Sequence, residues 1–566
     1  MKASGDGVTG GLLAGHDEVA RPLVLPSSFG QDGIEIQHQM AGGSPIFNVP
    51  AALELSGVLD RDALCRSISE IARRHDVLRT TFERRDGWLA RVVHPPRPVE
   101  LPTHDLRCLP VPDRISTART LLDGEAAKPF ELQTEPALRC MLVVLDDDRH
   151  VFFWNMHHII CDGWSKSVWA AELSACYGAF SAGAMPALPE LPVNYNDYVV
   201  RQRLIAPDTL EMQLEYWDQH LAGVETLPGV PTDKPRNATS SPRGEDAIFT
   251  LPIQTRRGLE NLARRNNATL FMVLHAAWAG LLHRISGQDD VVISVPFGGR
   301  PAAEFESLIG FFVNVLAIRL SLRGDPKFIH LIEQTRDSAL EGYENHEVPF
   351  QRVAERVLSR RDGRAGGFQQ VSLAFANLPY QNVHLNGLSA IRYELTRVDI
   401  RYELELHMWE DGDDGGLGGR LIYRPDLFEL ETVTRLVGDL CSVLETVVAA
   451  PDTRVSELPV ASRSTRPENW LWDLDDTAAE TKPIVAPRTA TEAAVHAIWT
   501  DLIHNEDVSV EDNFLDVGGN SFLLALMVTR IRDYLGAELS VPQIMSDPTI
   551  EGIAKLADTA SPRDLS

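Results

Sequence analysis

One stretch of the sequence, Asn155-Met156-His157-His158-Ile159-Ile160-Cys161-Asp162-Gly163-Trp164-Ser165, brings two histidines, an aspartate and a glycine into a short segment. The apolar run from Val151 to Trp154 predicts a buried strand before it, and the apolar spacing after Gly163 predicts a helix behind it. A tight connection between a strand and a helix commonly holds working side chains on a rigid support. We therefore predict that this connection contains the active site.

The two histidines are the candidate catalytic residues. The unperturbed pKa of an imidazole lies close to neutrality, so a histidine at the end of a buried strand can act as a general base. Adjacent side chains of an extended segment point to opposite faces, so only one of His157 and His158 can face a given cavity. A lone buried histidine is more often satisfied by hydrogen bonds within a core. The spacing of this pair from Asp162 and Gly163 favours a reactive site instead.

Three neighbours of the histidines have other expected roles. Asp162 lies too close to the turn to orient a histidine directly, so we expect it to pair with an arginine and hold the loop. Gly163 permits backbone angles or a close approach that a Cβ atom would forbid. Cys161 is a poor candidate nucleophile, because nothing beside it in the sequence would lower the pKa of its thiol.

The spacing of His157, His158, Asp162 and Gly163 resembles the His-His-x-x-x-Asp-Gly signature of condensation domains of nonribosomal peptide synthetases. Other acyltransferases of the same chloramphenicol-acetyltransferase-like fold share this motif, so the motif alone indicates a superfamily. The resemblance implies an α/β fold built as a pseudo-dimer, in which two similar lobes face each other across a tunnel. His158 is then the residue expected at the centre of the tunnel, and His157 is expected to be its structural neighbour.

Further stretches resemble motifs of the same family, in the same order along the chain. Arg74-His75-Asp76-Val77-Leu78-Arg79-Thr80-Thr81-Phe82 closely resembles the family motif R-H-E-x-L-R-T-x-F, and Ile309-Gly310-Phe311-Phe312-Val313-Asn314 matches a later motif. Residues 24–40 match the first motif loosely, with Gln31 as the clearest shared residue. Either Arg74 or Arg79 is expected to pair with Asp162, because a guanidinium can bind a carboxylate through two hydrogen bonds.

Near the end of the chain, Asp512-Asn513-Phe514-Leu515-Asp516-Val517-Gly518-Gly519-Asn520-Ser521 resembles the D-x-F-x-x-x-G-G-x-S context of peptidyl carrier domains. The paired glycines let the backbone turn sharply and place Ser521 at a helix N-terminus, where the helix dipole favours a phosphate. A simple N-cap serine is the alternative interpretation. The resemblance implies an all-α, four-helix carrier domain with 4'-phosphopantetheine covalently attached to Ser521.

These resemblances and the local composition predict several domains. The polar, proline-containing stretch after residue 450 is typical of a linker. The expected order is a disordered or docking tail at 1–20, a condensation domain at 21–450 with lobes at about 21–200 and 201–450, a linker at 451–487, a carrier domain at 488–560 and a tail at 561–566.

Composition argues against several classes of function. A formal net charge of -27 opposes binding to nucleic acid or to an anionic membrane, because both carry negative charge. The sequence lacks a run of about 18 apolar residues and a basic-then-apolar signal peptide, so we expect a cytoplasmic protein, and a monomer. The six cysteines are scattered without C-x-x-C spacing, so no metal site is expected.

The expected reaction is the transfer of an acyl or peptidyl group from a carrier-bound thioester to an amine or hydroxyl. The simplest acceptor is an aminoacyl thioester on Ser521. No adenylation domain follows the linker in the sequence, so we expect an adenylation enzyme acting in trans, together with an upstream donor carrier protein and a phosphopantetheinyl transferase. The sequence does not specify the donor acyl group, the acceptor, or whether the product is an amide or an ester. It also does not decide whether Ser521 carries the acceptor or serves as the donor to a later protein. The alternatives are a catalytically silent platform that recruits partner enzymes and a coenzyme-A-dependent acyltransferase.

Overall fold

In the computed structural model, the described residues cover most of the chain from residue 21 onward. They are 21–85, 87–224, 230–236, 243–359, 370–376, 383–396, 398–410, 415–461, 484–503, 508–514, 517, 527–528, 530–532, 534–537, 539, 543–544 and 547–559. The predicted tails at 1–20 and 561–566 and most of the predicted linker lie outside these residues, as do Gly518, Gly519, Asn520 and Ser521.

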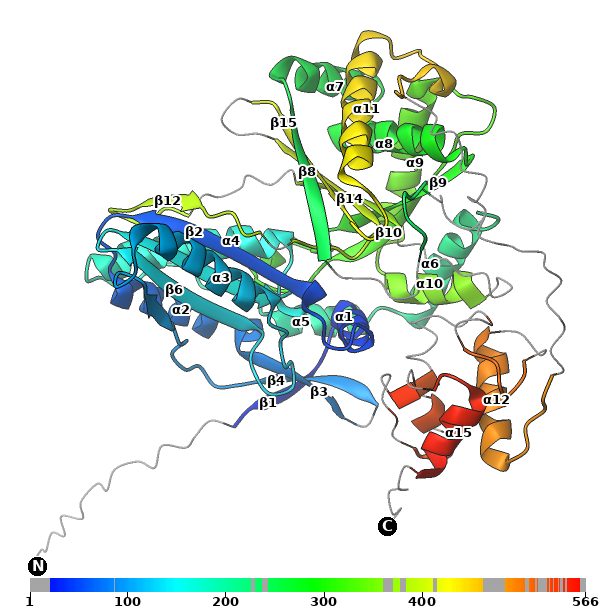
Figure 1. The fold of residues 1–566 in the computed structure, drawn as a ribbon, viewed down its shortest axis with the longest axis horizontal. Helices are drawn as coiled ribbons and strands as arrows, with labels where there is room; N and C mark the ends of the chain where they lie inside the picture. The colour runs from blue at the N-terminus through cyan, green and yellow to red at the C-terminus, as the bar shows by residue number, and fades with distance from the viewer. Residues whose placement is uncertain are drawn as a thin grey trace, which may run out of the picture.

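The first lobe contains a five-stranded sheet in the order β12-β2-β7-β6-β5 and a three-stranded sheet in the order β1-β4-β3 (Figure 1). The strands at the centre of the first lobe are apolar and buried on both faces. In β7, for example, Val151, Phe152 and Phe153 are all 0% exposed. Its own strands are β1 (Leu23–Pro26), β2 (Asn48–Ser56), β3 (Thr80–Arg85), β4 (Trp88–Val93), β5 (Thr103–Asp105), β6 (Leu138–Asp146) and β7 (Arg149–His157). Its helices are α1 (Phe29–Met40), α2 (Arg61–Arg74), α3 (Val111–Ala127), α4 (Gly163–Ser181) and α5 (Tyr195–Arg203).

The second lobe is organised around a seven-stranded sheet in the order β10-β9-β11-β14-β15-β8-β13. Its strands are β8 (Arg243–Leu251), β9 (Asp290–Phe297), β10 (Asn314–Ser321), β11 (Val371–Ala376), β13 (Val398–Asp399), β14 (Leu404–Glu410) and β15 (Leu417–Tyr423). Its helices are α6 (Pro207–His220), α7 (Ile253–Arg265), α8 (Leu270–Ser286), α9 (Phe328–Glu344), α10 (Phe350–Ser359) and α11 (Leu430–Ala449). Figure 1 shows the two lobes side by side, with α8, α9 and α11 at the top of the second.

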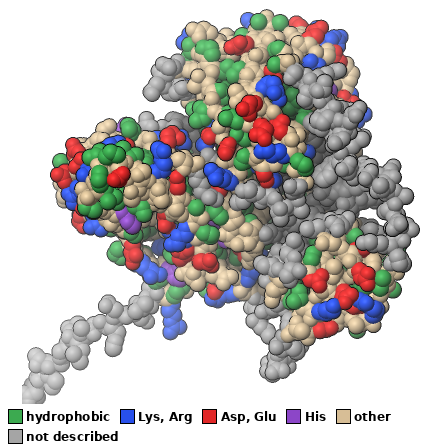
Figure 2. Space-filling view, in the orientation of Figure 1, with side chains coloured by type: hydrophobic (Ala, Val, Ile, Leu, Met, Phe, Trp, Pro, Cys, Tyr) green, Lys and Arg blue, Asp and Glu red, His purple; other side chains and the backbone are tan. Residues whose placement is uncertain are grey.

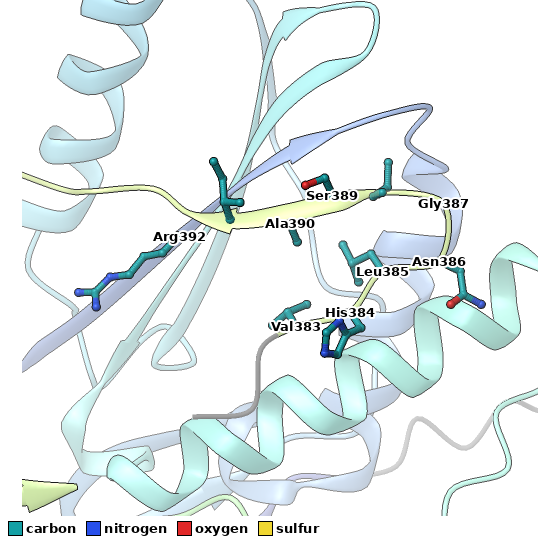
Figure 3. A pocket seen from close by; sticks show the side chains of 10 residues that line it. Val383, His384, Leu385, Asn386, Gly387, Ser389, Ala390 and Arg392 are labelled. Carbon is teal, nitrogen blue, oxygen red and sulfur yellow. The ribbon is translucent and has the colours of Figure 1, made fainter. Parts of the chain in front are cut away.

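One strand of the first-lobe sheet comes from the second half of the chain. Strand β12 (Ser389–Arg392) pairs antiparallel with β2, so that Arg392 lies opposite Leu53. Val383 and Leu385, which precede it, are buried in the core of the first lobe. Figure 3 shows this segment crossing beside β2, with the side chain of Arg392 pointing away from Val383 and His384. The crossing ties the two lobes together through backbone hydrogen bonds as well as through side chains.

A cavity of about 620 Å³ lies along the crossing segment and is lined by residues 383–392 (Figure 3). None of its lining residues belongs to the segment that contains His157 and His158. We therefore assign this cavity no part in the reaction.

The C-terminal part of the chain has a separate hydrophobic core. Helices α12 (Ala490–Ile503) and α15 (Ile550–Thr559) pack against each other around Trp499 and Phe514, whose ring centroids are 4.9 Å apart. Both rings are 0% exposed. Figure 1 shows these helices, in orange and red, as a small body next to the lobes.

The visible surface shows interspersed acidic and basic side chains rather than one large basic patch (Figure 2). Among the described residues, no single helix is long and apolar enough to cross a membrane. The sharply bent pair of α7 and α8, with 101° between them, meets that criterion only when both helices are counted together.

His275 in α8 makes the second lobe sensitive to acid. Its side chain is 0% exposed, neither ring nitrogen has a hydrogen-bond partner among the described residues, and burial lowers its pKa to about 3. An imidazole in an unfolded chain has a pKa of about 6.5. Below that pH the unfolded state therefore binds a proton that the native state excludes, and stability falls as the pH falls from about 6.5 toward 3.

We expect His275→Leu to weaken this acid sensitivity. Between pH 6.5 and 3, each pH unit can change the free energy of unfolding by up to about 1.4 kcal/mol for one such group. Urea unfolding at pH 7.5 and at pH 5 should therefore give a smaller difference in unfolding free energy for His275→Leu than for the parent. His330→Leu, at an exposed site on α9, is the matched control. An unchanged difference in His275→Leu would mean that the native state can protonate His275.

Candidate active site

The histidine pair lies at the junction that the sequence predicted. Strand β7 ends at His157, a short 3-10 turn covers His158–Ile160, and α4 begins at Gly163. Asp162 caps α4, because its side chain accepts a hydrogen bond from the backbone N–H of Ser165 at 2.8 Å. The connection is thus fixed at both ends by regular structure.

His157 is enclosed in the first lobe. Its Nδ1 accepts a hydrogen bond from the N–H of Ile159 at 3.1 Å, so the ring proton is on Nε2, which lies 3.3 Å from Nδ1 of His38. The rings of His38, Phe47 and Phe130 surround it, all with centroids within 6.0 Å. Burial holds the pKa of His157 well below its usual value, and the neighbouring histidines lower it further. This environment makes His157 a neutral structural residue.

His158 has a different environment, although it is adjacent in the chain. Its side chain is half-buried, and its ring meets the ring of Phe311 edge to face with centroids 5.3 Å apart. Nδ1 is buried without a hydrogen bond from any other described residue, whereas Nε2 keeps accessible surface. Desolvation by burial, together with the charges of Arg401 and Lys166, lowers the pKa of His158 to about 3. At neutral pH the ring of His158 is therefore uncharged, and its Nε2 keeps accessible surface.

The position of His158 is between the two lobes. His158 belongs to the first lobe, and it meets the ring of Phe311, which follows β9 of the second-lobe sheet but packs into the hydrophobic core of the first lobe. The charge of Arg401, just before β14, also acts on His158. The side chain is half-buried, and desolvation is the main cause that lowers its pKa.

The partner of Asp162 is Arg300, which the sequence did not indicate. Arg300 Nη1 lies 2.8 Å from Asp162 Oδ2, and Arg300 Nη2 lies 3.2 Å from Asp162 Oδ1. The two side chains are only 6% and 1% exposed. The same carboxylate accepts a hydrogen bond from the N–H of Phe312 at 3.3 Å. Asp162 therefore fastens the histidine-containing loop to the second lobe.

The expectation that Arg74 or Arg79 pairs with Asp162 is wrong. Arg74, at the end of α2, binds Glu172 of α4 at 3.1 Å and donates to the carbonyl of Pro189. Arg79 donates to the carbonyl of His94. Helices α2 and α4 pack side by side, so Arg74 meets the acidic residue on the facing surface of α4 rather than the cap at its start. These arginines support the first lobe, not the loop.

Gly163 is less constrained than expected. It does not have a positive φ, and a Cβ atom added to it would meet no other atom within 4 Å. The expectation of unusual backbone angles is therefore wrong, and no described protein group makes the close approach. The expectation for Cys161 is confirmed, because burial raises the pKa of its thiol to about 12.

Gln31 supports the same loop from α1. Its Nε2 donates to the carbonyl of Ile159 at 3.0 Å, and its side chain is 0% exposed. Ser165 adds a link to the second lobe, since its hydroxyl donates to the carbonyl of Gly310 at 2.9 Å. Gln31 was visible in the sequence as a shared motif residue. Arg300 gave no local signal, because its partner is distant in the chain.

The carrier-like segment is described only in part. Ser521 and the two glycines before it lie outside the described residues. Phe514, in the same motif, is buried in the core, and Asn513 forms a β-bridge with Thr549 just before α15. Asn513 and Phe514 are thus anchored to the helical body. No group of three or more potential metal ligands occurs in the described part of the chain.

Comparisons with known proteins identify both parts of the chain. The family model for the condensation domain matches residues 23–467, and the model for the phosphopantetheine attachment site matches residues 493–557. The residues between these matches are too few for an adenylation domain. The resemblances seen in the sequence are confirmed, and the second match identifies a domain type that carries covalently attached 4'-phosphopantetheine.

Similar proteins and solved structures agree with these two family matches. Chondramide synthase cmdD of Chondromyces crocatus is 37% identical over 466 residues, which cover 81% of this chain and only 12% of that protein. The X-domain in its complex with OxyB from teicoplanin biosynthesis is 26% identical, with a TM-score of 0.70 over 78% of this chain and 97% of that one.

The first condensation domain of the calcium-dependent antibiotic synthetase shows the same fold at 20% identity, with a TM-score of 0.64 over 78% of this chain and 99% of that one. Together with the match of the family model over most of the chain, this likeness leaves one assignment. The chain belongs to the condensation-domain family of nonribosomal peptide synthetases, with a phosphopantetheine carrier domain after the condensation domain.

Proposed function

We propose that this protein transfers an acyl or peptidyl group from a thioester on a separate carrier protein to a nucleophile held at His158. The favoured acceptor is an aminoacyl thioester on Ser521, charged by an adenylation enzyme acting in trans after a phosphopantetheinyl transferase has modified the serine. The observation that carries the proposal is the accessible, uncharged Nε2 of His158 at the meeting of the two lobes.

In this reaction the amine nitrogen attacks the thioester carbonyl carbon. A C–N bond forms, the C–S bond breaks, the donor leaves as a thiol, and the amine loses one proton. The phosphopantetheine group would supply a flexible thioester arm that carries the acyl unit to the lobes. The Nε2 lone pair of His158 would accept a hydrogen bond from the attacking amine and hold it against the carbonyl.

The pKa of His158 favours positioning over full proton abstraction. With a pKa of about 3, its imidazole is a weak base at neutral pH. Holding two reactants in the correct geometry can nevertheless contribute as much as general-base help or more. The Asp162–Arg300 pair acts indirectly, by keeping the loop of His158 against the second lobe.

A second candidate is a platform that recruits partner enzymes without catalysis. The likeness to the X-domain in complex with OxyB favours it, since the shapes agree over 78% of this chain.

A direct transfer assay separates the two candidates and also tests coenzyme A as a donor. The holo-protein, with an aminoacyl unit on Ser521, is mixed with one acyl group presented either on a carrier protein or on coenzyme A.

Product formed with the carrier-bound donor and lost in His158→Ala supports the proposal. Product formed only with the coenzyme A donor would instead support a coenzyme-A-dependent acyltransferase. The absence of product with every donor, while a partner enzyme binds the same preparation, would support the recruitment platform.

Ser521→Ala is expected to abolish both loading and transfer to the carrier. The hydroxyl is the attachment point, so intact mass spectrometry after incubation with a phosphopantetheinyl transferase and coenzyme A should show no mass increase. The matched control is Thr500→Ala, on α12 of the same carrier body, which should still gain one phosphopantetheine mass. A mass increase on Ser521→Ala would contradict the assignment of this serine.

A further inference from the structure

The ring of Phe311 meets that of His158, which has this one ring contact in the part of the chain that the structure describes. The ring centroids are 5.3 Å apart and the ring planes lie at 89°. Phe311 belongs to the irregular segment just before β10, and its side chain is only 7% exposed in the core of the first lobe. An edge-to-face pair of this kind favours one relative orientation of its two rings.

No other described residue holds the imidazole of His158 by a hydrogen bond. Its Nδ1 is buried without such a partner, and its Nε2 keeps accessible surface. A backbone group of His158 itself acts on the ring, but this contact lies within the residue. His157 differs, because its Nδ1 accepts from Ile159 and its Nε2 lies 3.3 Å from Nδ1 of His38. The orientation of the His158 ring therefore depends on packing, to which Phe311 contributes its own ring.

Hydrogen bonds to the first lobe fix the segment that carries Phe311. The hydroxyl of Tyr195, in α5, donates to the carbonyl of Phe311 at 2.6 Å, and Tyr195 is 1% exposed. Burial raises the pKa of Tyr195 well above its usual value, so this hydroxyl stays a donor. One residue before Phe311, the N–H of Gly310 donates to the hydroxyl of Ser165 at 3.1 Å. The ring of Phe311 is thus attached to a backbone that is held in place.

Gly30, in α1, leaves the space that the ring of Phe311 occupies. A Cβ atom added to Gly30 would lie 2.8 Å from Cε1 and 3.0 Å from Cδ1 of Phe311. Gly30 does not have a positive φ, so its backbone conformation does not require glycine. The close approach of the Phe311 ring does. The first lobe therefore holds Phe311 at two points, through Tyr195 in α5 and through Gly30 in α1.

We propose that Phe311 is a positioning residue, which holds the imidazole of His158 in the orientation that transfer requires. This inference rests on the proposed transfer function, and it gives a residue from the second half of the chain a part in that function. A ring contact of this kind favours the observed orientation by about 2- to 12-fold. Loss of the orientation can cost more than the contact itself, because a small misplacement of a reacting group lowers the rate strongly.

Phe311→Leu removes the ring and keeps an apolar side chain. Single-turnover transfer from a carrier-bound donor, measured by intact mass at several donor concentrations, should show a maximal rate about tenfold below that of the parent. The half-saturating donor concentration should not change, because Phe311 acts through His158. Phe180→Leu is the matched control: Phe180, at the far end of α4, is also 7% exposed in the same core. It should keep the parental maximal rate.

Gly30→Ala disturbs the contact while leaving both rings in the protein. The added Cβ atom must displace the ring of Phe311, so the maximal rate should fall about threefold or more. Gly124→Ala, in α3, is the matched control, because a Cβ atom there would meet no atom within 4 Å. It should keep the parental rate. Alanine favours the helix at both positions, so neither variant should unfold.

Labelling with diethyl pyrocarbonate gives a readout that needs no transfer. The reagent carbethoxylates an accessible imidazole nitrogen, and peptide mass spectrometry follows each histidine separately. Without the ring of Phe311 the imidazole of His158 can turn, so Phe311→Leu should raise the labelling rate of His158 about threefold or more. His384, which is exposed on the crossing segment, serves as the internal reference and should label at the parental rate in the same sample.

A parental maximal rate in Phe311→Leu would overturn the proposal, and so would a lowered rate without a change in the labelling of His158. An equal loss of rate in Phe180→Leu would also overturn it, because the loss would then follow core packing. A raised half-saturating donor concentration at the parental maximal rate would assign Phe311 to substrate binding instead. Absence of transfer in the parent, together with the expected change in labelling, would contradict the proposed function alone.

Discussion

Replacing His158 with alanine should lower the rate of acyl transfer by about 10²–10⁴-fold, the range that removal of an acid–base or positioning group produces. The side chain is half-buried, and Nε2 makes no hydrogen bond to another described residue, so its loss should leave the fold intact. Single-turnover transfer measured by intact mass, together with a thermal melt, would show both effects. His384→Ala, which removes an exposed imidazole from the crossing segment, is the matched control (Figure 3).

The pH dependence of the same assay distinguishes the two roles of His158. Because its pKa is lowered to about 3, the free imidazole is already uncharged above that pH and gains nothing from a further rise. The rate should therefore show no inflection near pH 6.5 from this residue. His158→Asn, which keeps a hydrogen-bond acceptor, should retain part of the activity if positioning dominates. An inflection near pH 6.5 that the parent shows and His158→Asn lacks would contradict this environment for His158.

Replacing Arg300 with alanine should be among the most destabilising single changes in the condensation domain. Removal of one side of a buried ion pair costs about 3–5 kcal/mol, because the remaining charge is left without a partner. Asp162 is 1% exposed and would become that charge. Urea unfolding followed by tryptophan fluorescence should show the loss. Arg300→Lys should not restore it fully, since an ammonium does not reproduce the two parallel hydrogen bonds of the guanidinium.

Two comparisons test whether loss of the Asp162–Arg300 ion pair causes the destabilisation of Arg300→Ala. Arg107→Ala removes an exposed arginine that also binds an aspartate, and it should leave the unfolding curve unchanged within error. The double variant Asp162→Leu/Arg300→Met removes both charges and should recover much of the stability lost in Arg300→Ala. Equal instability of the single and double variants would show that the loss arises from packing instead.

The local part of this site could be predicted from the sequence. The apolar run before His157 and the helical pattern after Gly163 specify a strand and a helix, and the junction between them was expected to hold His158. The opposite environments of the two histidines follow from the alternation of side chains at the end of β7. Such features depend on residues a few positions apart, which the sequence shows directly.

The remaining part depends on contacts between distant residues. Asp162 was expected to pair with an arginine, but local spacing could not distinguish Arg300, in the second lobe, from arginines in a nearby motif. The four-residue strand β12 is too short for a periodic signal, and its pairing with β2 is a product of the tertiary fold.

The pairing of β12 with β2 also limits how the protein can be divided. A fragment that ended near residue 205 would lack this strand and would leave the backbone N–H and C=O groups of β2 that face β12 without partners, while those that face β7 stay paired. Exposed sheet edges of this kind recruit strands from other chains and promote aggregation. Recombination at the boundary between the lobes would therefore create an aggregation-prone half of the domain. The smallest unit that can be transferred intact into a hybrid synthetase is the complete pair of lobes.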